Sequence, residues 1–437
     1  MTRELLRAYS SGSLPPQLLV EVGLEHLCGL CEHCRHEVEA WRSEQADPLI
    51  AMAEQAAGDA RQKKRAESEA RKLLTLSREQ RIPAIRRSIV RFRGPLLAEV
   101  LLERSREAVH ESPVEGLHLA ELARAVLHYS PNSPRSLGLA ALATAYKANA
   151  CRARGELREA AEQFRNIRYL VQQQGVADPS ILAQIDDLEG SLAKDRRLFP
   201  LAEQLFRRAA MLYRFAGSQA DVWRVVISLA DVYYYQGSLD RAIETVGRVL
   251  ALMPLRRVLT GAASPGGQEG KSSGARLVLC GVHNLALYLV EAGQYAEAAA
   301  VVADHQGLYD QFPETGLRLL WLRARIAAGT GRRGEAEEAL IAARGGFIAR
   351  GVGFDAALVS LDLAVLYAGQ GRTAPLRRLA EEIVPILEAQ DLHREAVAAL
   401  VLFQDTARQE ALSSSFLRDL RRYLRQARAD PHLRFRG

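Results

Sequence analysis

The sequence of 437 residues lacks any run of about 18 apolar residues, so no segment has the pattern of a membrane-spanning helix. Its first residues, MTRELLRAYSSGSLPP, also lack the apolar stretch of a secretory signal. Cysteines number only five, and three of them fall within seven residues. That clustering does not resemble the disulfide framework of a secreted protein and suits thiolates in a reducing compartment. We therefore expect a cytoplasmic protein with no membrane span.

Aromatic residues are also scarce, at 6% of the chain. Alanine, leucine, arginine and glutamate dominate instead, and these residues favour helices over strands. The hydrophobic content of 48% and the charged content of 25% are ordinary for a globular protein with a sizeable core. The composition predicts an all-α fold.

The net charge of +6 hides an uneven distribution. Residues 1–60 carry a net charge of −6, residues 61–106 carry +9, and the last twenty residues carry +5. The basic stretch RQKKRAESEARK could meet phosphates or an acidic partner, but its glutamates stand at helical spacing from the basic residues, which favours a solvated helix face. Without interleaved aromatics we do not expect nucleic-acid binding. Helices are expected over about 48–75, 78–92 and 95–109.

From about residue 137 the chain repeats a short pattern six times. The units are GELREAAEQF from 155, RLFPLAEQLF from 197, GSLDRAIETV from 237, GQYAEAAAVV from 293, GRRGEAEEAL from 331 and GRTAPLRRLA from 371. Five units begin with glycine, and five have alanine at the sixth position, namely Ala160, Ala202, Ala242, Ala298 and Ala336. Glycine allows a sharp turn between helices, and the small alanine lets two helices approach closely. The pattern predicts helix hairpins.

These units resemble the tetratricopeptide repeat family over roughly residues 114–412. The unit is nearer 40 residues than the usual 34, so we expect longer helices. The sixth unit has Leu376 where the alanine belongs. The resemblance implies an α-solenoid whose concave face, lined by the first helix of each hairpin, holds a protein or peptide. The groove positions carried over from the family are Asn149, Arg152, Arg224, Asp231, Tyr234, His283, Arg318, Trp321 and Arg325.

The longest spacing between units contains the stretch TGAASPGGQEGKSSGA. It approaches the patterns of a phosphate-binding loop and of a nucleophile elbow, but Pro265 stands where the loop needs glycine. Both motifs also need a strand before them. We expect a disordered loop of low complexity here, with no catalytic role for Ser272.

The stretch EHLCGLCEHCRHEVEAW concentrates possible metal ligands near the N-terminus. A helix over residues 15–30 would place His26 on its inward face, and Cys31 and Cys34 would open the next helix with both thiolates on one side. A structural zinc needs four tetrahedral nitrogen or sulfur ligands. These three residues supply three of them, and either Cys28 or His36 could supply the fourth. We predict a structural Zn²⁺ site.

This region also resembles the zinc-finger domain of anti-sigma factors. The matching residues are LLRAYSSGSL, His26 with Leu27, and CEHCRHEVEAW, within about the first 45 residues. The resemblance implies a zinc-held helical module that wraps a sigma factor. Its net negative charge would suit a basic partner. No membrane helix follows it, unlike in many members of that family.

These patterns predict three regions: a zinc-stapled helical module over 1–47, a charged helical connector over 48–112, and a repeat solenoid over 113–437 with C-terminal capping helices. The predicted function is a non-catalytic, regulatory protein-interaction scaffold with a docking module at its N-terminus. The alternative is an anti-sigma type transcriptional regulator with the repeats as sensor. A zinc or thiol enzyme would require Glu32 or Glu37 as a general base in a small hairpin without a substrate cleft, so we do not expect an enzyme.

Overall fold

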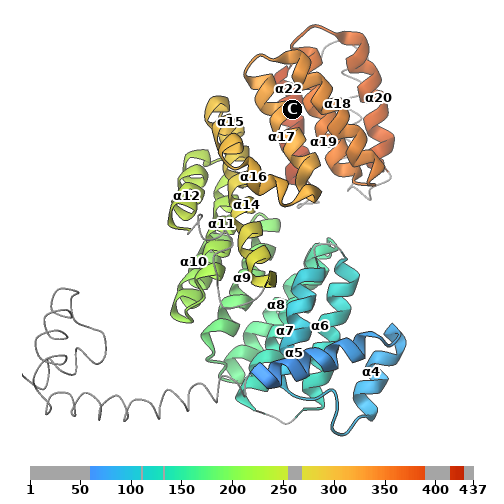
Figure 1. Ribbon diagram of the computed structural model, residues 1–437, viewed down its shortest axis with the longest axis vertical. Helices are drawn as coiled ribbons and strands as arrows, with labels where there is room; N and C mark the ends of the chain where they lie inside the picture. Colours follow the sequence, from blue (N-terminus) through green and yellow to red (C-terminus); the bar gives the residue numbers. More distant parts are fainter. Residues whose placement is uncertain (1–59, 110–111, 131–132, 254–267, 389–413, 428–437) are drawn as a thin grey trace, which may run out of the picture. The chain divides into compact units, whose positions relative to one another are not determined.

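The computed structural model describes residues 60–109, 112–130, 133–253, 268–388 and 414–427 (Figure 1). Every regular element in these ranges is a helix, which confirms the all-α prediction. The chain divides into two compact units, one made of Met1–Arg104 with Leu122–Pro131, the other of Ser105–Glu121 with Asn132–Gly437. Helix α6, Pro113–His128, contributes to both, so the region boundary expected near residue 113 stays a prediction.

The connector is helical, as the sequence predicts, over residues 60–74, in α4 (Arg78–Arg87) and in α5 (Pro95–Ala108). The basic side chains of the first of these helices are exposed, in keeping with a solvated face. Helix α4 ends five residues before the expected position 92. Ser88 is extended, Phe92 adopts a φ of 58°, and the Phe92 amide donates to Glu69 Oε2 at 2.9 Å. A long-range contact therefore turns the chain out of the helix.

Within the described residues, six helix hairpins follow α6, one for each repeat. Their first helices carry the predicted groove residues, and their second helices begin with the repeated motif. The hairpins are α7 with α8 (Pro134–Ala153, Leu157–Gln173), α9 with α10 (Pro179–Asp195, Phe199–Phe215), α11 with α12 (Gln219–Tyr235, Leu239–Leu252), α14 with α15 (Gln268–Glu291, Tyr295–Asp304), α17 with α18 (Gly316–Gly329, Arg333–Ala349) and α19 with α20 (Gly353–Ala368, Thr373–Glu388).

The turn inside each hairpin uses a left-handed residue at the first position of the motif. The five glycines there have φ between 68° and 84°. The second hairpin has Arg197 instead, and its φ is 61°. Its turn keeps the same hydrogen bond, since Leu198 N donates to Ala193 O at 2.8 Å, as Ser238 N donates to Tyr233 O at 2.9 Å in the third hairpin.

The repeated alanines lie at the contact between the two helices of each hairpin. All five are fully buried, which confirms the close approach that the motif predicts. In the sixth hairpin Leu376 is buried as well, in the core formed by α17 to α20 and α22. This hairpin accommodates the larger side chain within a different core packing.

Two features depart from regular hairpins. The expected loop of low complexity is wrong from Gln268 onward, because α14 begins there and includes the GKSSG stretch. Helix α14 is 24 residues long and continues into an apolar segment. The glutamine, glutamate, lysine and alanine near its start have good helix propensity, so they can extend the helix.

The fourth hairpin also ends in a broken helix, since α15 is followed by the short α16 (Gln306–Asp310) and a 3₁₀ turn (Pro313–Thr315).

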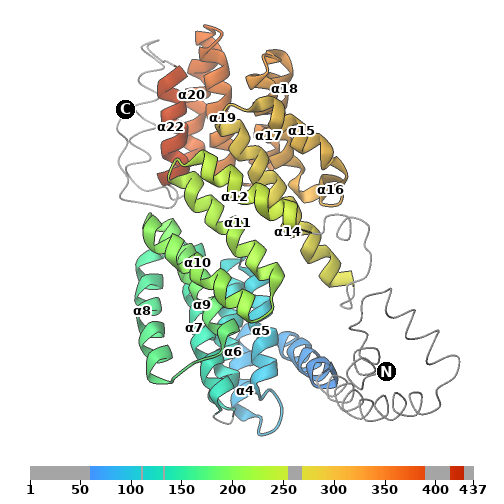
Figure 2. The same ribbon diagram turned by 90° about the vertical axis from the view of Figure 1, so that its left-hand side faces the viewer.

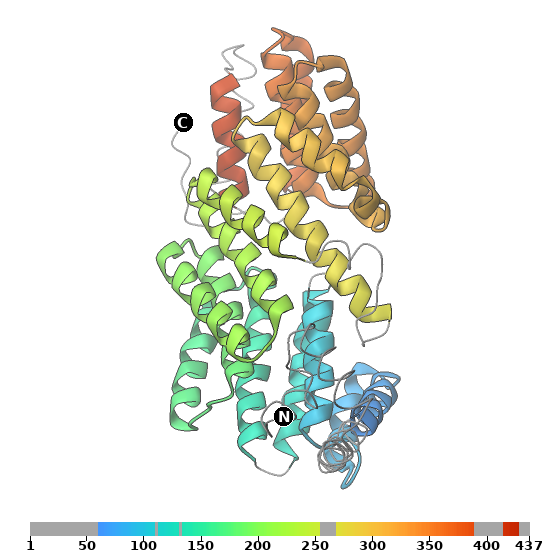
Figure 3. The same cartoon turned by 60° about the vertical axis from the view of Figure 1, so that its left-hand side comes forward.

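The last described helix is α22, Ser414–Ala427. It packs against α19, the first helix of the sixth hairpin, and runs beside it in Figures 2 and 3. Leu417, Leu420 and Tyr423 are its buried residues. The last described helix thus packs on a first helix, and the predicted C-terminal capping helices stay a prediction.

Candidate functional site: polar contacts between the first helices

The predicted zinc ligands His26, Cys28, Cys31, Cys34 and His36 lie outside the described residues. Among the residues that the structure does describe, no group of three or more His, Cys, Asp or Glu side chains could hold a metal ion. The zinc site therefore stays a prediction.

The predicted groove residues lie where consecutive first helices meet, and we call these contacts the inner polar contacts. On α7, Arg152 donates through Nε to Asn149 Oδ1 at 2.9 Å and through Nη1 to Asp195 Oδ2 of α9 at 2.6 Å. Asn149 thus orients Arg152, and Arg152 connects the first two hairpins.

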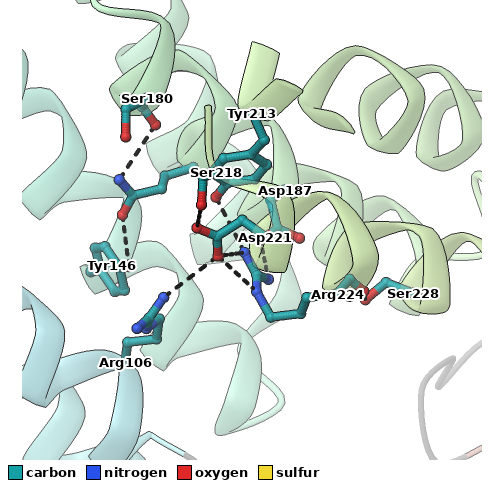
Figure 4. A network of polar contacts seen from close by, with 10 residues as sticks. Arg106, Tyr146, Ser180, Asp187, Tyr213, Ser218, Asp221, Arg224 and Ser228 are labelled. Atoms are coloured by element: carbon teal, nitrogen blue, oxygen red, sulfur yellow. Dashed lines mark hydrogen bonds and ion pairs between the residues drawn. The ribbon is translucent and has the colours of Figure 1, made fainter. Parts of the chain in front are cut away.

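Arg224 of α11 forms the centre of a second group, drawn in Figure 4. Its guanidinium donates to Asp187 Oδ2 of α9 at 2.5 Å, to Asp221 Oδ1 at 3.1 Å and to the Tyr213 hydroxyl at 3.2 Å. Burial lowers the pKa of Arg224, but the Asp187 carboxylate and its neighbours raise it above the ordinary value. Burial raises the pKa of Tyr213 in turn. Both groups therefore keep their protons, and Arg224 donates to the neutral Tyr213 hydroxyl.

Asp231 of α11 joins three hairpins. It accepts from Lys194 of α9 at 3.4 Å, from Asn284 of α14 at 3.2 Å, and from the hydroxyl of Tyr288, also on α14. Burial alone would lower the pKa of Lys194, yet the Asp231 carboxylate raises it overall. The lysine therefore remains charged in this partly buried position.

Glu291 and Asp362 anchor the last group of inner polar contacts. Glu291 of α14 accepts from Arg325 of α17 at 2.9 Å and from Tyr234 of α11 at 3.4 Å. Asp362 of α19 accepts from Trp321 Nε1 at 2.7 Å and lies 3.7 Å from Arg325 Nε. Most predicted groove residues therefore bond to a neighbouring first helix, as in Arg152 with Asp195, Arg224 with Asp187 and Arg325 with Glu291.

His283 and Arg318 differ from the others. The His283 ring packs edge-on against Tyr309 of α16, with Nδ1 at 3.4 Å from the hydroxyl. Arg318 is exposed and has no hydrogen bond or ion pair to any residue that the structure describes. It shares its helix face with Trp321 and Arg325, three and seven residues further on, so it is an available cation on that face.

Because of His283, we expect the free energy of unfolding to depend on pH. Its pKa is lowered to about 4, first by burial and then by Arg318. The unfolded chain takes up this proton near pH 6.5, so the stability due to neutral His283 is present above pH 6.5 and is lost as pH falls toward 4. Between pH 7.5 and pH 5 we expect the wild type to lose about 2 kcal/mol more than His283→Gln. Urea unfolding at both pH values measures this, and equal losses would contradict it.

The sequence did not single out the acids that receive these donors. Asp186, Asp187, Glu291 and Asp362 stand inside apolar helical patterns, as in QIDDLEG and SLDLAVLY. A carboxylate flanked by buried leucines or isoleucines must find a cation or a donor, and that pattern is the signal that could have found them.

The described residues offer little for catalysis. The free cysteines among these residues are Cys151, which is buried, and Cys280, whose residue surface is exposed. The pKa of both thiols is nevertheless raised, first by desolvation of the sulfur atom, that of Cys280 to about 11. A raised pKa disfavours the thiolate, which is the reactive form. The site carboxylates are occupied by arginine, lysine or tyrosine donors. The arrangement holds helices together and presents charged and aromatic groups, as a recognition surface does.

No helix in the described ranges is long and apolar enough to cross a membrane.

No protein-family profile and no curated protein matches the sequence. Among solved structures, a Rap protein complexed with competence and sporulation factor matches with a TM-score of 0.53 and 11% identity, over 75% of this chain and 89% of that chain. The apo form of RapI matches with a TM-score of 0.53 and 12% identity, over 72% and 85%. The fold is a tetratricopeptide-like α-solenoid. The sequence prediction of that architecture is confirmed over the described residues.

Proposed function

We propose that the chain is a non-catalytic, regulatory scaffold whose first helices hold a protein or peptide partner. The observation that carries this proposal is the line of charged and aromatic residues along those helices, which ends in an exposed arginine without a described partner. Arginine and large aromatics are the residues that dominate recognition energetics. The Rap protein with the same architecture was solved in complex with competence and sporulation factor, which supports a ligand-holding role for such an array.

The test compares two arginines of α17. Arg318 lies on the face of Trp321 and Arg325, whereas Arg323 is exposed on another face and donates to Gln306 of α16. We expect the partner that co-purifies with the full chain to be lost at least tenfold in Arg318→Glu and retained in Arg323→Glu. Co-purification of nothing, or an equal effect of both changes, would contradict the proposal.

We also propose that residues 1–47 form the zinc-stapled docking module that the sequence predicts. One zinc per chain is expected in the purified protein, and Cys31→Ser or Cys34→Ser should abolish it. Loss of the zinc ion in only one of the two variants Cys28→Ser and His36→Ala would identify the fourth ligand. Metal analysis of the purified variants measures this, and a wild-type chain without zinc would contradict it.

The finer alternative is an anti-sigma role for this module, which rests on its resemblance in sequence and its net negative charge. It requires co-purification with a sigma factor that Cys31→Ser abolishes. Binding that survives this change, or the absence of any sigma factor, would count against it and leave the scaffold proposal intact.

A further inference from the structure

Helix α22 is amphipathic and lies on a face that a tetratricopeptide-like array keeps for partners. Its residues Leu417 and Leu420 are fully buried and Tyr423 is nearly so, in the core that α17 to α20 form. Arg418 and Arg422, on the other side of α22, are exposed. The apolar face of α22 packs against α19. Figures 2 and 3 show the ribbon of α22 in dark red.

Arg421 of α22 takes part in the inner polar contacts. Its guanidinium lies between Glu291, at 3.3 Å from Oε2, and Asp362. The same two carboxylates bind Arg325, so two acids and two arginines meet in one group. All four side chains are at most 17% exposed. Loss of Arg421 would remove one of these two cations from sheltered carboxylates, and this is unfavourable.

The contact with Glu291 reaches across a large part of the array. Glu291 precedes Arg421 by 130 residues and belongs to the fourth hairpin, whereas Asp362 belongs to the sixth. A helix that only shields the end of the last hairpin has no need to reach the fourth. The position of α22 instead matches that of a ligand that bridges the first helices of the fourth and sixth hairpins.

We propose that α22 occupies, within its own chain, the face of α14, α17 and α19 that binds a partner. The partner that replaces it is an amphipathic helix with the pattern Leu-x-x-Leu-Arg, whose arginine takes the place of Arg421. This rests on the proposed scaffold function and adds both the partner's chemistry and an internal competitor.

The pattern follows from the contacts of α22. The cation of the replacing helix falls between Glu291 and Asp362, because Arg421 supplies a positive charge to both carboxylates there. Leu417 and Leu420 precede Arg421 by four and one residues, and their complete burial sets the apolar positions of the replacing helix. A partner without the arginine would bury the leucines but could not satisfy the acids.

The test measures binding of a labelled synthetic peptide of residues 414–427 to the full chain by fluorescence anisotropy. We expect Leu417→Ala combined with Arg421→Ala to bind the peptide at least tenfold more tightly than the wild type, because its own α22 is weakened. Arg422→Ala is the matched control, since Arg422 is exposed and pairs with Asp419 of its own helix. It should bind as the wild type does.

A peptide with alanine at the position of Arg421 should bind the double variant at least tenfold more weakly. Equal binding by all three chains would overturn the role of α22, while the scaffold function would still be decided by the comparison of Arg318 and Arg323. A wild-type dimer that Arg421→Ala converts to a monomer would also overturn the arrangement within one chain, and would assign the face to α22 of a second copy.

If the double variant does not fold, as circular dichroism would reveal, the wild-type chain provides the test. A peptide with a photo-reactive group at the position of Tyr423 should, in excess, cross-link to α17 or α19. Cross-links confined to other helices would overturn the proposal.

Discussion

Replacing Asp186 by alanine is expected to lower the free energy of unfolding by about 3 kcal/mol. The Asp186 side chain is 1% exposed and receives Arg168 from α8, at 2.6 Å, and both donors of Arg208 from α10, at 2.5 and 2.6 Å. Its removal leaves Arg208 without this acceptor and Arg168 with Glu189 as its remaining acid. Both arginines are partly exposed and can be hydrated, so we expect the low end of the range for broken buried ion pairs.

The matched control for this change is Glu244→Ala. Glu244 pairs with Arg248 one turn away on α12, and both side chains are more than half exposed. Such a pair contributes about 0.5 kcal/mol or less. Urea unfolding of the two variants beside the wild type gives the comparison. If Asp186→Ala costs no more than Glu244→Ala, the buried acid does not stabilise the second hairpin.

Replacing Leu376 by alanine is expected to destabilise the protein by about 2–5 kcal/mol, although alanine is the residue of the other five hairpins. Leu376 is buried in a core that it shares with Leu379 and with Leu417 of α22, so its truncation leaves a cavity. The reverse change in the second hairpin, Ala202→Leu, should cost about 1–3 kcal/mol, because Ala202 is fully buried between closely packed helices.

Urea unfolding measures the free energy of unfolding of both variants. The test is whether each variant is more or less stable than the wild type. A consensus argument from the repeat predicts that Leu376→Ala stabilises and Ala202→Leu destabilises. The packing predicts that both destabilise. A gain in stability for Leu376→Ala would show that the sixth hairpin is strained by its leucine.

The hairpins could be predicted from the sequence because their signals are local. Each hairpin requires a residue with positive φ at its turn and a small side chain where its two helices touch. Glycine supplies the first in five of the six units, and alanine supplies the second in five of the six. The period of the motif therefore places both helices of each hairpin. The end of α4 could not be predicted in this way, because the contact that turns the chain, from Phe92 to Glu69, spans 23 residues.

The repeat pattern predicts which residues lie on the first helices, but not which partners they bond to. Arg224 finds Asp187 at 37 residues' distance, and Asp231 finds Tyr288 at 57. These pairings depend on how far one first helix is displaced along the next, which the repeat pattern does not specify. The place of Arg421 depends in addition on the packing of α22, which has no counterpart among the repeats.

The turn at Arg197 has a consequence for how the array unfolds. Its guanidinium lies over the ring of Phe199, at 5.4 Å, and over that of Tyr235 at the end of α11, at 5.1 Å. A glycine turn has no side chain and is independent of the next repeat. Unfolding of α11 would remove the contact with Tyr235 and leave this turn with its unfavourable backbone conformation. In a nearest-neighbour description of the solenoid, the second and third hairpins therefore share one cooperative opening step.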